Sequence, residues 1–126
     1  MTPTQRTLGL YRQHGFMTGV VERRLPMPGS FGVLVDLFGF IDLIAVRAGR
    51  IIGVQATSVP NVSARAKKIL NNRSEESKTW LGAGAEIHVI GWKKYVKPVD
   101  RKWWRYRLLR ITSKTLVSGL LELVEL

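Results

Sequence analysis

Residues 39–58, "GFIDLIAVRAGRIIGVQATS", predict a β-hairpin whose first strand is apolar except for one acidic residue, Asp42. Two runs rich in Ile and Val flank the short segment Ala48, Gly49 and Arg50, and a brief glycine-containing loop between such runs is typical of a hairpin. A carboxylate that is buried without a partner carries a high desolvation cost. We therefore expect Asp42 to accept hydrogen bonds near a strand end or to bind a cation.

The second strand of this hairpin carries two side chains that can meet Asp42. Gln55 and Thr57 are two residues apart and point to the same face of the sheet, whereas Val54 and Ala56 point to the other face. Hard cations such as Mg²⁺ bind carboxylate, amide and water oxygens, and a bound water can act as the nucleophile in hydrolysis. The pattern indicates metal-assisted hydrolysis of a phosphodiester, with Mg²⁺ or Mn²⁺ at one end of the hairpin.

Helix and strand signals alternate through the rest of the chain. Thr2 and Pro3 favour the start of a helix, and Gly15 favours its end. The expected elements are a helix over 5–14, strands over 16–25, 33–46 (interrupted at 38–39) and 51–58, a helix over 62–81, strands over 85–95 and 102–112, and turns at 26–29 and 97–100. Within the second helix, residues 71–77, "NNRSEES", are either mainly solvent-facing or a break. These elements predict one α/β domain over residues 1–126, with a central mixed β-sheet flanked by helices in the order α-β-β-β-α-β-β.

Residues 115–126 form an apolar tail with two glutamates. The pattern fits a strand, a short helix or a segment that faces a partner, and it does not distinguish them. We treat this tail as a candidate interface, for example in a homodimer.

Composition limits the classes of function. The chain of 126 residues has no cysteine, which excludes disulfides, thiolate zinc sites and thiol catalysis and fits a reducing cytoplasm. We see no signal peptide and no apolar run of the roughly 20 residues that a membrane-spanning helix needs. Twenty Lys and Arg oppose nine Asp and Glu, and the net charge of +11 predicts a polyanionic partner. We therefore expect a cytoplasmic protein that binds nucleic acid, with no membrane partner and no small-molecule cofactor.

The positive charge is concentrated between residues 61 and 110. Trp92, Trp103 and Trp104 alternate there with basic residues, a mixture that can stack on bases and hold phosphates, although a single Trp is more often part of a core. His14 and His88 are too isolated to predict a metal site. The candidate nucleic-acid-binding residues are Arg65, Lys67, Lys68, Arg73, Lys93, Lys94, Lys102 and Arg105.

Several pieces of the chain resemble one nuclease superfamily. An acid at the end of a strand, a short turn and a second strand with the motif (D/E)-x-K form the core of the PD-(D/E)XK, or restriction-endonuclease-like, fold. The segments "QRTLGLYRQHGF" and "GFIDLIAV" resemble the opening of archaeal-type Holliday junction resolvases and related small phage nucleases, and "EIHVIGWKK" and "KWWRYRLLRIT" resemble their closing strands. The resemblance covers residues 5–112 and implies a metal-dependent DNA endonuclease, acting on branched or structured DNA such as Holliday junctions. It also fits a phage-encoded protein that acts in the host cytoplasm.

The resemblance assigns roles to individual residues. Asp42 matches the metal-binding Asp, Gln55 stands where the family has Asp or Glu, and Thr57 stands where it has Lys. Glu22 and Asp36 are the substitutes for the further acid that the family places near its first helix or strand. The implied catalytic residues are therefore Asp42, Gln55, Thr57 and Glu22, and the implied metal ligands are Asp42, Gln55 and Asp36.

The departures at Gln55 and Thr57 leave other readings open. Compared with the family motif, Gln55 lacks one negative charge and Thr57 lacks the positive charge of the family lysine. Lys67 or Lys68 would have to supply that positive charge. One alternative is a catalytically inactive protein that binds DNA through a nuclease-like fold. Another is an interaction protein that uses its apolar tail for self-association and its charge for RNA or membranes.

Overall fold

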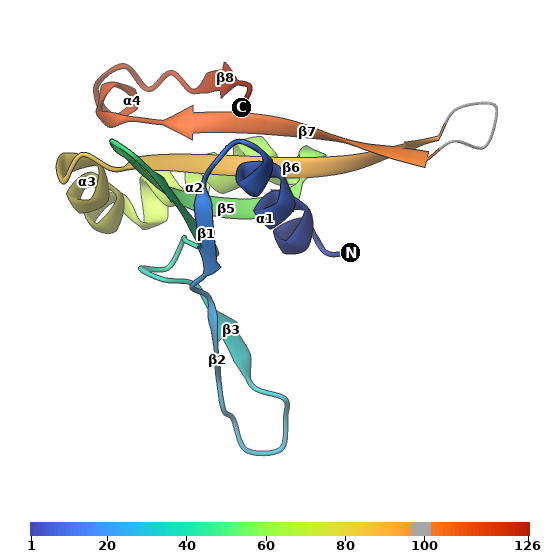
Figure 1. Ribbon diagram of the computed structural model, residues 1–126. Helices are drawn as coiled ribbons and strands as arrows, with labels where there is room; N and C mark the ends of the chain where they lie inside the picture. The colour runs from blue at the N-terminus through green and yellow to red at the C-terminus, as the bar shows by residue number, and fades with distance from the viewer. Residues whose placement is uncertain (97–101) are drawn as a thin grey trace.

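A six-stranded mixed β-sheet lies at the centre of the computed structural model, which describes residues 1–96 and 102–126 (Figure 1). Neighbouring strands follow the order β1-β4-β5-β6-β7-β8, and β5 and β6 form the parallel pair while the other pairs are antiparallel. The strands are β1 (Met17–Val20), β4 (Leu43–Arg47), β5 (Arg50–Ser58), β6 (Glu86–Val96), β7 (Lys102–Ile111) and β8 (Glu122–Val124). The expected α/β architecture with a mixed, helix-flanked sheet is confirmed.

Helices cover both faces of this sheet. Helix α1 (Pro3–Gln13) begins with a capping box between Thr2 and Gln5 and packs on one face. The opposite face carries the 3₁₀ turn η1 (Val59–Asn61) and the helices α2 (Val62–Asn72), α3 (Ser74–Gly82) and α4 (Ser113–Ser118). A helical crossover from β5 is what allows β6 to run parallel to it. No helix among the described residues has the length and apolar composition needed to span a bilayer.

The hairpin predicted from residues 39–58 forms as expected. Arg47 pairs with Arg50, so the turn contains two residues, and its Gly49 has a φ of 77°. Along β5 the side chains alternate between the two faces, as period-2 geometry requires. Val54 packs in the core under α1, whereas Gln55 belongs to the opposite face, which α2 covers.

The long strands expected over 16–25 and 33–46 are each divided in the structure. The first becomes β1 and β2 (Arg23–Leu25), and the second becomes β3 (Val33–Val35) and β4. Strands β2 and β3 pair with each other as a separate two-stranded ribbon, which stands away from the main sheet (Figure 1). The break occurs at Val21 and Glu22, because their N–H groups both donate to the carbonyl of Asp42 and the chain then leaves the sheet.

The structure decides two features that the sequence left open, the break within residues 62–81 and the form of the tail. The helix is broken at Arg73, whose φ of −125° and ψ of 36° are not helical, so α2 and α3 are distinct. The tail forms both a short helix, α4, and a strand, β8, which pairs with β7. The observed order therefore differs from α-β-β-β-α-β-β, because β2, β3, α3, α4 and β8 are additional. The predicted turn at 97–100 lies outside the described residues.

Candidate metal centre

A tight turn places Asp36 opposite Asp42. The N–H of Phe40 donates to the carbonyl of Leu37, and the residues between them, Phe38 and Gly39, have φ values of 56° and 82°. Two successive positive φ values are the signature of a type I′ turn, which joins antiparallel segments. Leu37 then bridges to Ile41, so the next residues outward on the two segments are Asp36 and Asp42.

Glu22 completes a cluster of three acids. One carboxylate oxygen from each of Glu22, Asp36 and Asp42 lies within 4.8 Å of the other two. Asp42 is 6% exposed, and the other two are partly buried. The N–H groups of Val21 and Glu22 hold this segment against Asp42, with N···O distances of 2.9 and 3.1 Å to its carbonyl. Three residues that are distant in sequence thus share one site.

Strand β5 positions two of these carboxylates. The N–H of Ala56 donates to Asp42 Oδ2 at 2.9 Å, and Gln55 Nε2 donates to Asp36 Oδ2 at 3.2 Å. Gln55 is itself buried, so its amide is held beside the cluster. These contacts place the predicted residues Asp42, Asp36, Gln55 and Glu22 in one constellation.

The electrostatics of the cluster favour a bound positive charge. Burial, a hydrogen bond with the Asp36 carboxyl and the negative charges of Asp36 and Glu22 raise the pKa of Asp42 to about 8, although the Ala56 N–H acts in the opposite direction. Within the described part of the chain, none of the three acids forms an ion pair with Lys or Arg. A cation at this position would offset the mutual repulsion and favour the ionised form of Asp42.

The donor set fits a hard divalent cation. Three carboxylates and the Gln55 amide oxygen are the kinds of ligand that Mg²⁺ and Mn²⁺ take, and Mg²⁺ is usually held by one or two carboxylates with waters completing its shell. In the structure the Gln55 amide nitrogen faces Asp36, so its oxygen remains available for a ligand or a water. The acidic group thus supports divalent-metal binding without distinguishing Mg²⁺ from Mn²⁺.

A basic pocket adjoins the acids. It has a volume of about 350 Å³ and is lined by Asp36, Gly39, Gln55, Arg65, Lys68, Asn72 and Arg73. Residues 65, 68 and 72 lie on one face of α2, because three and four residues make about one helical turn. The Arg73 guanidinium packs closely on Gly39, where a Cβ would collide with it. Three cations and three oxygen-bearing side chains therefore face one space, which suits a phosphate group.

The remaining predicted site residues lie outside this pocket. Thr57 is buried on the same face as Gln55, and no hydrogen bond joins its hydroxyl to the acids within the described residues. Lys67 is exposed on α2 but does not line the pocket, whereas Lys68 lines it together with Gln55. The side chain of Lys102 lies outside the described part of the chain.

The other predicted basic residues lie on a hairpin arm. Strand β5 ends where Ser58 pairs with Trp92, and β6 and β7 continue beyond it (Figure 1). Lys93 pairs with Arg105 across this arm, and both cations lie over the Tyr95 ring, at 5.3 and 5.7 Å from its centroid. Lys94 is exposed on the same arm.

Two of the tryptophans have structural partners. Trp92 packs against the core under α1 and donates to Thr7 Oγ1. The Trp104 ring is 39% exposed, with the Arg6 guanidinium 3.6 Å from its centroid. Trp92 is therefore a packing residue, and Trp104 is a stacking surface that Arg6 covers in part. The Trp103 side chain lies outside the described part of the chain.

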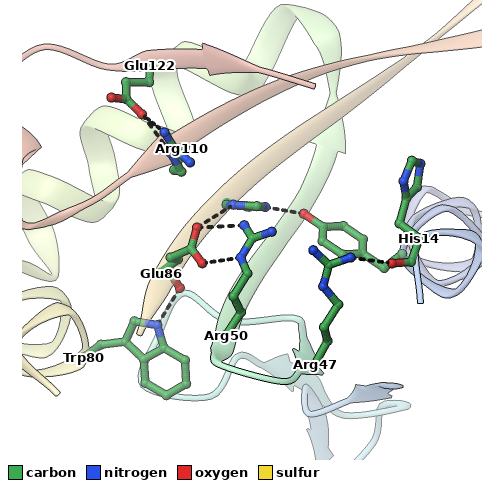
Figure 2. Close-up of polar contacts among 9 residues, drawn as sticks. His14, Arg47, Arg50, Trp80, Glu86, Arg110 and Glu122 are labelled. Atoms are coloured by element: carbon green, nitrogen blue, oxygen red, sulfur yellow. Dashed lines mark hydrogen bonds and ion pairs between the residues drawn. The ribbon is translucent and has the colours of Figure 1, made fainter. Parts of the chain in front are cut away.

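A second polar cluster lies under α1, on the opposite face of the sheet. The Tyr11 hydroxyl forms a hydrogen bond of 2.5 Å with His88 Nδ1, and His88 Nε2 lies 3.6 Å from Glu86 Oε1. Figure 2 shows Glu86 facing the Arg50 guanidinium, which donates to both of its oxygens at 2.8 and 2.9 Å. His88 and Arg50 lower the pKa of Glu86 to about 2, while burial lowers the pKa of His88. His88 is thus a buried side chain that lies between Tyr11 and Glu86, and its Nε2 forms no hydrogen bond with a described residue.

Sequence reasoning missed Asn72 and this buried cluster. A helical wheel that starts from Arg65 identifies Asn72 as a neighbour of Lys68, so a signal for it existed. The contact between Tyr11 and His88 spans 77 positions and has no local pattern that predicts it. Comparison with protein-family models, with curated proteins and with solved structures finds no match for this chain.

Proposed function

We propose that this protein is a metal-dependent DNA endonuclease with a restriction-endonuclease-like fold. The observation that carries the proposal is the convergence of Glu22, Asp36 and Asp42 within 4.8 Å, beside a pocket that Lys68 and two arginines line. An acidic group that fits a divalent cation and an adjoining basic pocket that fits a phosphate are the two parts that metal-assisted phosphodiester hydrolysis needs.

The residues of the site divide into two groups by charge. Glu22, Asp36 and Asp42 would hold the metal, with the Gln55 amide oxygen as a further ligand. When bound, Mg²⁺ would act as a Lewis acid and would make a water molecule more acidic. Lys68 and Arg65 would bind the phosphate and offset its developing negative charge. Arg73, packed on Gly39, would fix the position of the same phosphate.

The fold assignment is supported by the position of the motif. Asp42 lies directly before β4, and a two-residue turn joins β4 to β5. Strand β5 carries Gln55 and Thr57 on the face that α2 covers. This is the arrangement that the PD-(D/E)XK resemblance implies, with Q-x-T in place of (D/E)-x-K. Because of that resemblance, the proposed substrates include branched DNA such as Holliday junctions.

A catalytically inactive DNA-binding protein is the second candidate. It is favoured by the neutral residues at Gln55 and Thr57 and by the raised pKa of Asp42, which keeps a proton in the metal-free cluster at neutral pH. In that case the acids would be remnants, and the basic pocket would bind a DNA phosphate without hydrolysis. The two candidates differ in whether a divalent cation produces cleavage.

A cleavage assay tests the proposal. The protein is incubated with four-way junction, flap, single-stranded and duplex DNA in Mg²⁺ or Mn²⁺, and products are resolved on denaturing gels. We expect cleavage of at least one substrate. Asp42→Asn should reduce the rate by at least about 100-fold, since even residues that only support a metal ligand change activity by about 10–100-fold.

Glu75→Gln is the matched control, because Glu75 is an exposed acid on α3, away from the cluster. It should cut as fast as the wild type. If the wild type cuts no substrate but binds DNA, the inactive DNA-binding protein is the correct reading. If Asp42→Asn cuts as well as Glu75→Gln does, the cluster is not the catalytic site.

A further inference from the structure

The β2–β3 ribbon (residues 23–35) leaves the body of the molecule at the acidic cluster (Figure 1). Glu22 comes directly before β2, and Asp36 follows directly after β3. Two of the three clustered carboxylates therefore form the base of the ribbon. A molecule that binds along the base of the ribbon would therefore lie next to the candidate metal centre.

Apolar side chains of the ribbon are exposed on both of its faces. Phe31 is 93% exposed, and the further exposed apolar side chains are Leu25, Met27, Val33 and Leu34. An isolated two-stranded ribbon is only marginally stable in water, and contiguous exposed apolar surface marks an interaction site. The ribbon therefore has the surface of an element that inserts into a partner.

The tip of the ribbon is preorganised. Ser30 N–H donates to the carbonyl of Met27 at 3.3 Å, with Pro28 and Gly29 between them and a φ of 75° at Gly29, as in a type II turn. Across the ribbon, Arg24 Nη1 donates to the carbonyl of Phe31 at 3.2 Å. These contacts hold the backbone at Phe31 in place before binding, so that less ordering of the main chain is needed when a partner binds.

The charge of the ribbon identifies the class of partner. Residues 23–35 contain Arg23 and Arg24 and no acidic residue. The side chain of Arg23 forms no hydrogen bond or ion pair with any described residue, so its guanidinium is available for a phosphate. Edge-to-edge pairing of two ribbons would bring these arginines together, and charged edges oppose such pairing. Charge complementarity thus favours DNA over a second copy of the chain.

We infer that the β2–β3 ribbon is a DNA wedge that inserts Phe31 between bases at a branch point or another unstacked step. Proteins that kink DNA insert Phe, Leu, Met or Pro in this way, and the unstacking cost is lowest where pairing is already interrupted. Arg23 would bind a phosphate beside that step, close to the acids at the ribbon base. The inference deepens the proposed function, on which it rests for the choice of DNA as substrate, and it specifies branched or mismatched DNA.

A fluorescence experiment tests the wedge without requiring cleavage. A four-way junction with 2-aminopurine beside the branch point is titrated with protein in EDTA, so that no divalent cation supports hydrolysis. We expect a several-fold rise in fluorescence on binding, and a junction affinity above that for a duplex of the same length. Phe31→Ala should remove most of the rise and reduce the junction preference by about 10-fold, within the range that base–aromatic stacking contributes.

Leu120→Ala is the matched control, since Leu120 is an apolar residue that is 74% exposed and lies outside the ribbon. It should behave as the wild type does, and Phe31→Trp should retain the fluorescence rise. An equal rise with Phe31→Ala would overturn the wedge. The wedge would also be overturned if, without DNA, the wild type sediments as a dimer and Phe31→Ala as a monomer, while both give the same fluorescence rise with the junction. If the fluorescence rise is absent but Mg²⁺-dependent cleavage occurs, the wedge is wrong and the proposed function is unaffected. If the fluorescence rises but no DNA is cut, the proposed function is wrong and the wedge is unaffected.

Discussion

Asp42 is held in the protein by interactions that favour its protonated form. Its side chain is 6% exposed, it shares a hydrogen bond with Asp36, and the charge of Glu22 is close. The folded protein therefore retains a proton on Asp42 up to a pKa of about 8, whereas the unfolded chain releases it near the ordinary value of 3.8. The folded state binds more protons than the unfolded state across that interval, so stability must fall as the pH rises through it.

We predict a pH-dependent loss of stability in metal-free protein. The free energy of unfolding, measured in urea with EDTA, should decrease from pH 7 to pH 8 by up to about 1 kcal/mol per pH unit and level off above about pH 9. The lowered pKa of His88 acts in the opposite sense, but only below its ordinary value of 6.5. Asp42→Asn should flatten the curve, and Mg²⁺ should restore the stability that the wild type loses. An unchanged slope in Asp42→Asn would contradict the assignment.

At the scale of elements, α2 is placed by a glycine on the adjacent strand. A Cβ at Gly91 would lie 2.7 Å from the carbonyl oxygen of Ser58 and would collide with the side chain of Val62. The start of α2 therefore rests directly on β6, and the same helix carries Arg65 and Lys68, which line the basic pocket. The position of the basic pocket thus depends on a residue that is not part of it.

We predict that Gly91→Ala destabilises the fold by about 1–3 kcal/mol, the usual effect of added volume in a packed core. The comparison is Gly9→Ala in α1, where a Cβ meets nothing within 4 Å. That change should stabilise the protein by about 0.5–1 kcal/mol, because Ala is the better helix former. Urea unfolding, monitored by circular dichroism, measures the change in the free energy of unfolding for each variant. Equal effects at the two positions would contradict the close packing of α2 on β6.

At the scale of the whole molecule, two projecting elements and one helix carry exposed positive charge, and the helix places its charge beside the acidic cluster. The β2–β3 ribbon carries Arg23, the β6–β7 arm carries Lys93 and Arg105, and α2 carries Lys68 beside the acids (Figure 1). With a net charge of +11, such an arrangement favours contacts with several phosphates of one DNA molecule at once.

We predict DNA binding that weakens steeply with salt. The logarithm of the binding constant should fall linearly with the logarithm of the salt concentration, and Lys68→Ala and Lys93→Ala should each reduce the slope by about 1. Lys114→Ala, an exposed lysine on α4, should leave the slope unchanged. Fluorescence anisotropy with a labelled duplex measures all four proteins. A slope near zero in the wild type would contradict phosphate contacts by this surface.

Much of the local structure could be predicted from the sequence. Thr2 and Pro3 predicted the first helix, Ala48 and Gly49 the β4–β5 turn, and the alternation along β5 the common face of Gln55 and Thr57. These features depend on residues close in sequence, where capping, turn geometry and period-2 alternation act directly. Arg73 shows the limit, since the sequence left residues 71–77 as either a solvent-facing stretch or a break, and no Gly or Pro there marks the residue at which α2 ends.

The sequence by itself determined the α/β class, the excess of positive charge and the choice of Asp42, Asp36, Gln55 and Glu22 as candidate ligands. Only the tertiary structure decided that these residues meet, that Lys68 and not Lys67 lines their pocket, and that residues 23–35 form a projecting ribbon. The physical reason is that the site depends on hydrogen bonds between segments distant in sequence, such as those from Val21 and Glu22 to Asp42. Local propensities do not encode such contacts, because they form only when the sheet assembles.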